Sequence, residues 1–219
     1  MKKIFLLTAM VTLSFLMTAC LDSDGDNSYN NLRADLVELT TTSATKVPWA
    51  TTDEDERLTF SSPITVSWAE KADTVYRALL YYNKVINGAP EPVAISYVPV
   101  LRPEELKDGD KMYNDPVILE SIWTSKNNKY LNLNIGLKTG AMDGLDSSQT
   151  LGLVINGVTE HEDGTKTYDL EFYHNQNRVP EYYVSNLYVS IPLNYFNPGD
   201  DAKITINTYN GSITKEYTF

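Results

Sequence analysis

The segment Tyr130-Leu131-Asn132-Leu133-Asn134-Ile135 gives the clearest structural signal in the chain, because apolar residues occupy every second position and asparagines stand between them. Successive side chains of a β-strand point to opposite faces of a sheet, so this alternation predicts a strand with one buried face. The same period recurs in other segments rich in tyrosine and β-branched residues. Strands are therefore predicted over residues 32–40, 46–49, 58–60, 74–86, 93–101, 117–125, 129–138, 150–158, 166–173, 184–193, 203–208 and 213–219.

Turn-forming dipeptides separate the predicted strands, since glycine supplies the positive backbone φ that tight hairpin turns require. Asn210-Gly211 is the clearest case and predicts that the chain ends as an antiparallel hairpin. The other dipeptides of this kind are Asn87-Gly88, Asp108-Gly109, Asp143-Gly144, Asn156-Gly157, Asp163-Gly164 and Pro198-Gly199. Only residues 103–107 are typical of a short helical turn, with Pro103 at a tolerated first position. The predicted fold class is all-β.

The alternating pattern is interrupted at residues 102–116, where Pro, Glu, Lys, Asp and Gly predominate. We predict a domain boundary in this segment. A smaller barrel-like domain is assigned to residues 32–113, and an antiparallel β-sandwich to residues 114–219. Each part is large enough to fold around a core of its own.

The N-terminus predicts export. Lys2 and Lys3 precede an apolar run that is too short to span a bilayer and that ends in Met17-Thr18-Ala19-Cys20. Residues 1–19 are typical of a signal peptide, and their end resembles the lipobox at which lipoprotein signal peptidase cleaves before a lipidated cysteine. Acyl chains on Cys20 would anchor the mature chain to a membrane, since each buried methylene contributes ~0.8 kcal/mol. An ordinary secretory signal is the alternative.

Cys20 is the single cysteine of the chain, so no disulfide is expected in the mature protein. Residues 20–31 form an acidic tether that resembles the export signal of lipoproteins displayed on the outer membrane. We therefore expect a lipid-anchored outer-membrane protein facing the cell exterior. The tether aspartates alternate as EF-hand ligands do, but Asn27 and Arg33 stand where that calcium loop needs Gly and Glu.

Charge argues against a nucleic-acid partner. The formal net charge is −11, and no basic stripe is visible along the chain. Phosphate backbones are bound by clustered Lys and Arg, so no nucleic-acid binding is expected. An acidic surface instead favours solubility and keeps the protein away from anionic lipid headgroups.

Four strand blocks in the second half resemble the NigD-like lipoproteins. They are Tyr130-Leu131-Asn132-Leu133-Asn134-Ile135, Thr150-Leu151-Gly152-Leu153-Val154, Tyr168-Asp169-Leu170-Glu171-Phe172-Tyr173-His174-Asn175 and Tyr188-Val189-Ser190-Ile191-Pro192-Leu193. With the lipobox and the acidic tether, the resemblance covers most of the mature chain. It implies an OB-like barrel followed by a C-terminal β-sandwich. The family is associated by genomic context with production of, or immunity to, the bacteriocin nigrescin, so the resemblance implies a role in bacteriocin protection.

Few residues are suited to catalysis. The chain has two histidines: His161 lies in a predicted acidic turn, and His174 ends a predicted strand. No nucleophile-elbow motif accompanies them, and adjacent residues of one turn cannot enclose a metal ion. If His174 has a structural role, one of its ring nitrogens is expected to form a hydrogen bond with a backbone carbonyl. A pair of glycosidase carboxylates is an alternative that the sequence leaves open. Such a pair is recognised by the distance between its two carboxyl groups in the folded protein. The acidic run at residues 53–56 is interpreted as an exposed loop.

Aromatic side chains provide the candidate binding surface. Tyr182 and Tyr183 stand near the start of a predicted strand and are the candidate binding residues, since amphipathic rings bring large contact area at low entropy cost. The alternative is that they fill the sandwich core. Tyr81 and Tyr82 are adjacent in one strand, so one is predicted to face the core and the other solvent. The tryptophans, Trp49, Trp68 and Trp123, are interpreted as core residues.

These features favour a non-enzymatic surface lipoprotein of NigD type that binds a protein or peptide partner and takes no cofactor or metal. A carbohydrate-binding accessory lipoprotein is the alternative, because OB-like barrels and sandwiches both present loops suited to oligosaccharides. Coplanar exposed Tyr or Trp rings in one groove would favour it. A pilus subunit would need a donor strand at one terminus, but residues 213–219 already have a predicted hairpin partner.

Overall fold

The computed structural model describes residues 31–84, 88–142 and 148–219. The predicted signal peptide, Cys20, the tether up to residue 30 and the Asp143-Gly144 turn lie outside these described residues. In the described part, no helix is long and apolar enough to cross a membrane.

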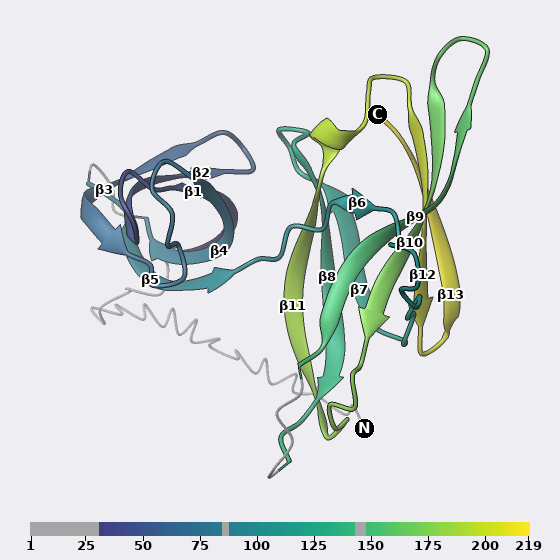
Figure 1. The fold of residues 1–219 in the computed structure, drawn as a ribbon. Coiled ribbons are helices and arrows are strands. Elements are labelled where there is room, and N and C mark those ends of the chain that lie inside the picture. The colour runs from purple at the N-terminus through teal and green to yellow at the C-terminus, as the bar shows by residue number, and fades with distance from the viewer. Residues whose placement is uncertain (1–30, 85–87, 143–147) are drawn as a thin grey trace, which may run out of the picture.

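The first domain is a half-barrel of five antiparallel strands, the predicted OB-like barrel (Figure 1). Its strands are β1 (Leu32–Thr40), β2 (Lys46–Thr52), β3 (Arg57–Thr65), β4 (Val75–Asn83) and β5 (Glu91–Tyr97). They lie in the order β3-β2-β1-β4-β5. Alternate side chains point inward, as the period of two predicts, and Leu39, Val47 and Leu80 are fully buried in the barrel core.

The second domain is a β-sandwich of a five-stranded and a three-stranded sheet, in the orders β13-β12-β10-β9-β6 and β11-β8-β7 (Figure 1). Its elements are β6 (Pro103–Glu104), β7 (Ile118–Thr124), β8 (Tyr130–Thr139), β9 (Thr150–Glu160), β10 (Lys166–Asn175), β11 (Tyr183–Pro192), η2 (Leu193–Tyr195), β12 (Asp201–Thr208) and β13 (Gly211–Thr218). Most neighbouring strands are antiparallel, whereas β10–β12 and β6–β9 are parallel.

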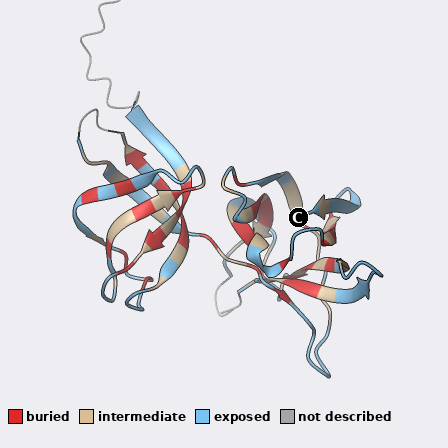
Figure 2. Ribbon diagram, turned by 90° about the horizontal axis from the view of Figure 1, so that it is seen from above, coloured by how far each residue is buried: buried red, intermediate tan, exposed pale blue. Residues whose placement is uncertain are grey.

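Residues 130–135 lie in β8, at the centre of the three-stranded sheet. Leu131, Leu133 and Ile135 are each 0% exposed and face the five-stranded sheet, so the predicted buried face is confirmed. Figure 2 shows the same alternation of buried and exposed residues along the strands of both domains. The final hairpin is confirmed as well: β12 pairs with β13, and Gly211 adopts the φ of 106° that favours glycine in the turn.

The helical turn predicted at residues 103–107 is wrong. Pro103 and Glu104 instead form β6, which pairs with Leu153 and Val154 of β9. A segment of this length gains little from helical hydrogen bonds, so pairing with a neighbouring strand decides its conformation. Leu101, just before this segment, belongs to the sandwich core, and β6 is a strand of the sandwich.

The turn predicted at Asn156-Gly157 is also wrong, because both residues lie inside β9. Along β10, Asp169 pairs with Gly157 and Leu170 with Ile155, so the ladder shifts by one residue. Asn156 is the extra residue of a β-bulge. Strand pairing on both sides of the dipeptide overrides its turn preference, and β9 continues to the turn at Asp163-Gly164.

Candidate functional site

Arg77 fixes the barrel to the sandwich. Its position on β4 alternates with Ala78, which faces the barrel core, so the guanidinium leaves the barrel on its outer side. Only 3% of Arg77 is exposed. Its Nη1 lies 2.7 Å from Oδ1 of Asp53, and its Nη2 donates to Oδ2 at 2.7 Å. This two-pronged ion pair holds the loop after β2 against the outer face of β4.

The sandwich supplies the other partners of the Arg77 guanidinium. The Nε group donates to the Ser190 hydroxyl at 3.1 Å, and Nη2 donates to the Asn132 side-chain oxygen at 3.2 Å. Asn132 in turn donates to Asp53 at 2.9 Å. The ring of Tyr130 lies 4.2 Å from the Arg77 guanidinium carbon, which adds a cation–π contact. We call Asp53, Arg77, Tyr130, Asn132 and Ser190 the joint.

A second carboxylate strengthens the contact between the domains. Glu38 of β1 accepts hydrogen bonds from the Tyr130 hydroxyl at 2.8 Å and from Lys129 at 3.0 Å. Burial, with the hydrogen bond to Glu38 second, raises the pKa of Tyr130 to about 12. The hydrogen bond to Glu38 also raises the pKa of Lys129. Both groups therefore keep their protons throughout the neutral range.

The acidic run at residues 53–56 was predicted to be an exposed loop, and for Asp53 this is wrong. Its side chain is 17% exposed and paired with Arg77. Its backbone carbonyl also accepts a hydrogen bond from the Asn127 amide at 2.9 Å. Glu54 pairs with Lys126 of the sandwich. Sequence alone gives no signal for these contacts, because Arg77 lies 24 positions away and the sandwich partners lie more than seventy positions away along the chain.

Beside the joint, a cleft of about 510 Å³ opens between the domains. Tyr81 lines it on the barrel side, and Trp123 and Tyr188 line it on the sandwich side. Tyr81 is 37% exposed and Tyr82 is 2% exposed, so the predicted opposite facing of these neighbours is confirmed. Trp123 is 36% exposed, and its assignment to the core is wrong. Its ring meets that of Tyr188 edge-on at 86°, unlike the coplanar platform that would favour sugar binding.

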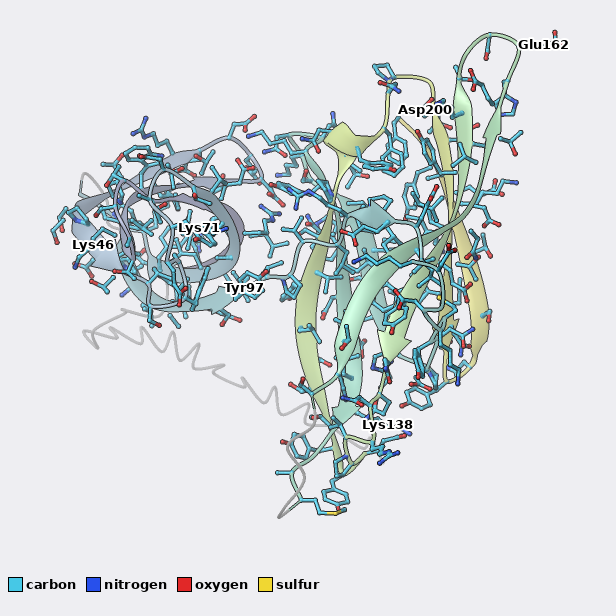
Figure 3. The ribbon with its side chains drawn as sticks, viewed as in Figure 1. Lys46, Lys71, Tyr97, Lys138, Glu162 and Asp200 are labelled. Atoms are coloured by element: carbon cyan, nitrogen blue, oxygen red, sulfur yellow. The ribbon has the colours of Figure 1, made fainter. Side chains whose placement is uncertain are left out.

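The predicted binding residues lie at one end of the sandwich, where β11 begins. Tyr182 is 66% exposed and Tyr183 is 60% exposed, so neither ring fills the core. Val184 and Met142 at this end are exposed by 46% and 52%. We call Met142, Tyr182, Tyr183 and Val184 the aromatic end. Figure 3 shows the neighbouring Lys138 at this end of the sandwich, opposite Asp200.

The backbone of the aromatic end is well anchored. The Tyr182 amide donates to the Thr139 carbonyl at 3.0 Å. A Cβ at Gly140 would lie 2.7 Å from Cδ2 of Tyr182, so the absence of a side chain there lets the ring lie against the backbone. Lys138 pairs with Glu181 at 3.3 Å and lies 3.9 Å from the centre of the Tyr209 ring. The two tyrosines therefore project from a fixed support.

The two histidines lie in different surroundings, one buried and one exposed. His174 is 0% exposed, and its Nδ1 donates to the Asp115 carbonyl at 3.0 Å, as its structural interpretation predicts. Its Nε2 is buried without a hydrogen-bond partner among the described residues, and burial lowers the pKa of the ring. His161 is exposed and contacts the Thr167 hydroxyl at 2.8 Å. In the described ranges, no three His, Cys, Asp or Glu side chains gather as metal ligands would.

A known protein family matches the part of the chain that forms the sandwich. The family model of the NigD-like C-terminal beta sandwich domain matches residues 99–219, which is more than half of the chain. Its start lies just before Leu101, which belongs to the sandwich core. A search of curated proteins found no match.

Three solved structures share the fold. A NigD-like immunity protein from Bacteroides caccae is 24% identical, with a TM-score of 0.65 over 85% of this chain and 96% of that one. A putative toxin related protein from Parabacteroides distasonis is 16% identical, with a TM-score of 0.61 over 86% and 93% of the two chains. A protein of unknown function from Bacteroides vulgatus is 19% identical, with a TM-score of 0.61 over 86% and 90%. At these identities the likeness concerns the fold, whereas the family match assigns membership: the chain belongs to the NigD-like family.

Proposed function

We propose that this chain is a non-enzymatic lipoprotein, anchored in the outer membrane through a lipid on Cys20 and facing the cell exterior, that binds a protein or peptide partner through its aromatic end. The observation that carries the proposal is the exposure of three consecutive residues, Tyr182, Tyr183 and Val184, on an anchored backbone. Tyrosine and methionine are enriched at protein interfaces, whereas charged residues are depleted from interface centres.

Bacteriocin protection is the biological role that fits this proposal. A fold neighbour is described as an immunity protein and another as toxin related. Immunity to a secreted polypeptide requires a surface that recognises a polypeptide. An exposed group of rings provides large contact area while few rotatable bonds must be fixed.

The experiment starts from the mature chain without its lipid, residues 21–219, used as bait for outer-membrane and culture-supernatant fractions. A partner captured saturably is then titrated against the wild type and against a variant carrying Tyr182→Ala and Tyr183→Ala. Loss of two central rings should weaken binding at least about 30-fold, since one such residue contributes ~2 kcal/mol or more.

Two controls separate the alternatives. Trp123→Ala removes an exposed ring from the interdomain cleft and should leave the affinity unchanged. A glycan array run with the same protein tests the carbohydrate alternative. Reproducible glycan binding with no protein partner would reject the proposal, and so would equal affinity of the wild type and the double tyrosine variant.

A further inference from the structure

The barrel is open between β3 and β5. These strands are the two edges of the sheet, and no backbone hydrogen bond joins them in the described residues. A groove of about 390 Å³ lies between them, lined by residues 64–68 on one side and 92–95 on the other. We call this groove the seam. It belongs to neither the joint nor the aromatic end.

Hydrogen bonding to β4 determines which backbone groups of β5 face the seam. The Val98 amide donates to the Arg77 carbonyl at 3.1 Å, so Arg77 and Val98 form a hydrogen-bonded pair of the ladder. Such pairs alternate with pairs whose N–H and C=O groups point away from each other. By this alternation, Ile95 and Tyr97 direct their backbone groups away from β4 and toward the free edge.

The edge of β3 also has backbone groups that point away from its neighbouring strand. The Val66 amide donates to the Thr45 carbonyl at 2.9 Å, so the neighbouring pair of Thr65 with Lys46 is not hydrogen bonded. The backbone N–H and C=O of Thr65 therefore point to the free edge. Within the described residues, both sides of the seam thus offer backbone N–H and C=O groups that no other strand pairs with.

The two edge strands, β3 and β5, run in the same direction. Each strand of the order β3-β2-β1-β4-β5 is antiparallel to its neighbour, so β3 and β5 run parallel to each other. One added strand can therefore be antiparallel to both edges at once. It would close the sheet as a sixth strand with antiparallel pairing throughout.

The lining of the seam indicates the chemistry of its occupant. None of its residues is charged, although the whole chain has a net charge of −11. Val93 is 60% exposed, and Ile64 and Ile95 are half-buried against the barrel core. Pro92, which lacks an N–H, bounds the groove at one end. The ring of Trp68, three residues after β3, lies 5.3 Å from the ring of Tyr97, and Figure 3 shows Tyr97 at the end of β5.

We propose that the seam accepts an uncharged, extended segment of a partner polypeptide, added as a strand antiparallel to both β3 and β5. Main-chain hydrogen bonds to the two edges provide affinity, and apolar side chains of the segment pack between Ile64 and Ile95. The seam uses residues distinct from the aromatic end, so it is a second interaction site and does not depend on the function proposed above.

The probe is a phage-displayed library of random linear peptides, panned on the mature chain and depleted on an Ile95→Pro variant, which lacks one outward N–H. A saturable uncharged peptide should slow amide hydrogen exchange at Thr65, Ile95 and Tyr97 by at least about tenfold. The Tyr182→Ala, Tyr183→Ala variant should bind the same peptide unchanged, since its seam is intact.

Peptide chemistry provides a test that uses only the wild-type protein and so does not depend on the folding of a variant. A strand inserted between two edges directs alternate amides to opposite sides, so N-methylation of either alternate set should weaken binding at least about tenfold. The proposal is overturned if a peptide that is N-methylated in one or both alternate sets binds as tightly as the unmodified peptide. Enrichment of no saturable peptide overturns it too, as does protection confined to residues outside the seam.

Discussion

The joint and the aromatic end both lie on outer faces or ends of the β-domains, yet they differ in what covers them. Arg77 and Asn132 point out of their own domains and are 3% and 0% exposed, because each domain covers the outer face of the other. Tyr182 and Tyr183 also point outward and stay exposed, since no part of the described chain lies over them. Outward-facing residues that are covered within the chain hold the fold, and those left uncovered are free for a partner.

The largest expected effect on stability comes from breaking the joint with Arg77→Met. The substitution keeps most of the side-chain length but leaves Asp53 and Asn132 without their central donor. Removing one partner of a largely buried ion pair should cost about 3 kcal/mol of unfolding free energy. Urea unfolding measures this loss.

Arg57→Met is the matched control for Arg77. This arginine also lies over an aromatic ring, that of Trp49 at 4.2 Å, but it is exposed. Its replacement should cost less than about 1 kcal/mol. Equal effects of the two substitutions would contradict the distinction between the joint and an ordinary surface contact.

A smaller effect is expected from pH acting on His174, which is buried on the strand that ends near the aromatic end. Burial lowers its pKa in the folded state, so the unfolded chain binds more protons below the ordinary histidine value of about 6.5. Unfolding free energy should fall with decreasing pH from that value, by at most ~1.4 kcal/mol per unit for one proton. His174→Gln should remove this dependence between about pH 5 and 6.5, and an unchanged slope would show that another group titrates.

Tyr130→Phe tests the outer part of the joint. The variant keeps the ring beside Arg77 but loses the hydrogen bond to Glu38, so a cost of about 1 kcal/mol is expected. Because the pKa of Tyr130 is about 12, the wild type should lose none of this contribution up to pH 9. Urea unfolding at neutral and alkaline pH, compared between the two proteins, measures both effects. A wild-type loss at pH 8 that the variant lacks would contradict this assignment.

The smallest effect on stability is expected at the aromatic end. Tyr182→Ala together with Tyr183→Ala removes exposed rings and no polar side-chain contact that holds the fold. Surface substitutions of this kind usually change unfolding free energy by less than ~0.5 kcal/mol each. A loss comparable to that of Arg77→Met would show that the rings are structural.

The sequence predicts the strands better than it predicts what lies on their outer faces. The alternation in β8 correctly places Leu131 and Leu133 in the core, because it encodes one buried face. It gives no information on Asn132, whose burial depends on a barrel more than fifty positions away. The acidic run likewise predicts a solvated Asp53, because the sequence does not show that Arg77 folds back onto it.

The wrong local predictions have a common cause. Asn156-Gly157 has the composition of a turn, and residues 103–107 have that of a short helix, but residues of both stretches pair with a neighbouring strand: Gly157 with Asp169 of β10, and Pro103 and Glu104 with β9. Strand pairing outweighs local preferences of a few tenths of a kcal/mol per residue. By contrast, the exposure of Tyr182 and Tyr183 was anticipated as one of two alternatives, because Pro180 and a nearby strand start placed them at the edge of the sandwich.

We propose that the uncovered aromatic end binds the partner, while the joint only holds the two domains together. The most direct measurement is a titration of the captured partner against the wild type and the double tyrosine variant, with unfolding free energy measured on the same samples. We expect the variant to bind at least about 30-fold more weakly, with its unfolding free energy preserved within ~1 kcal/mol. Undiminished binding by a stably folded variant would contradict it.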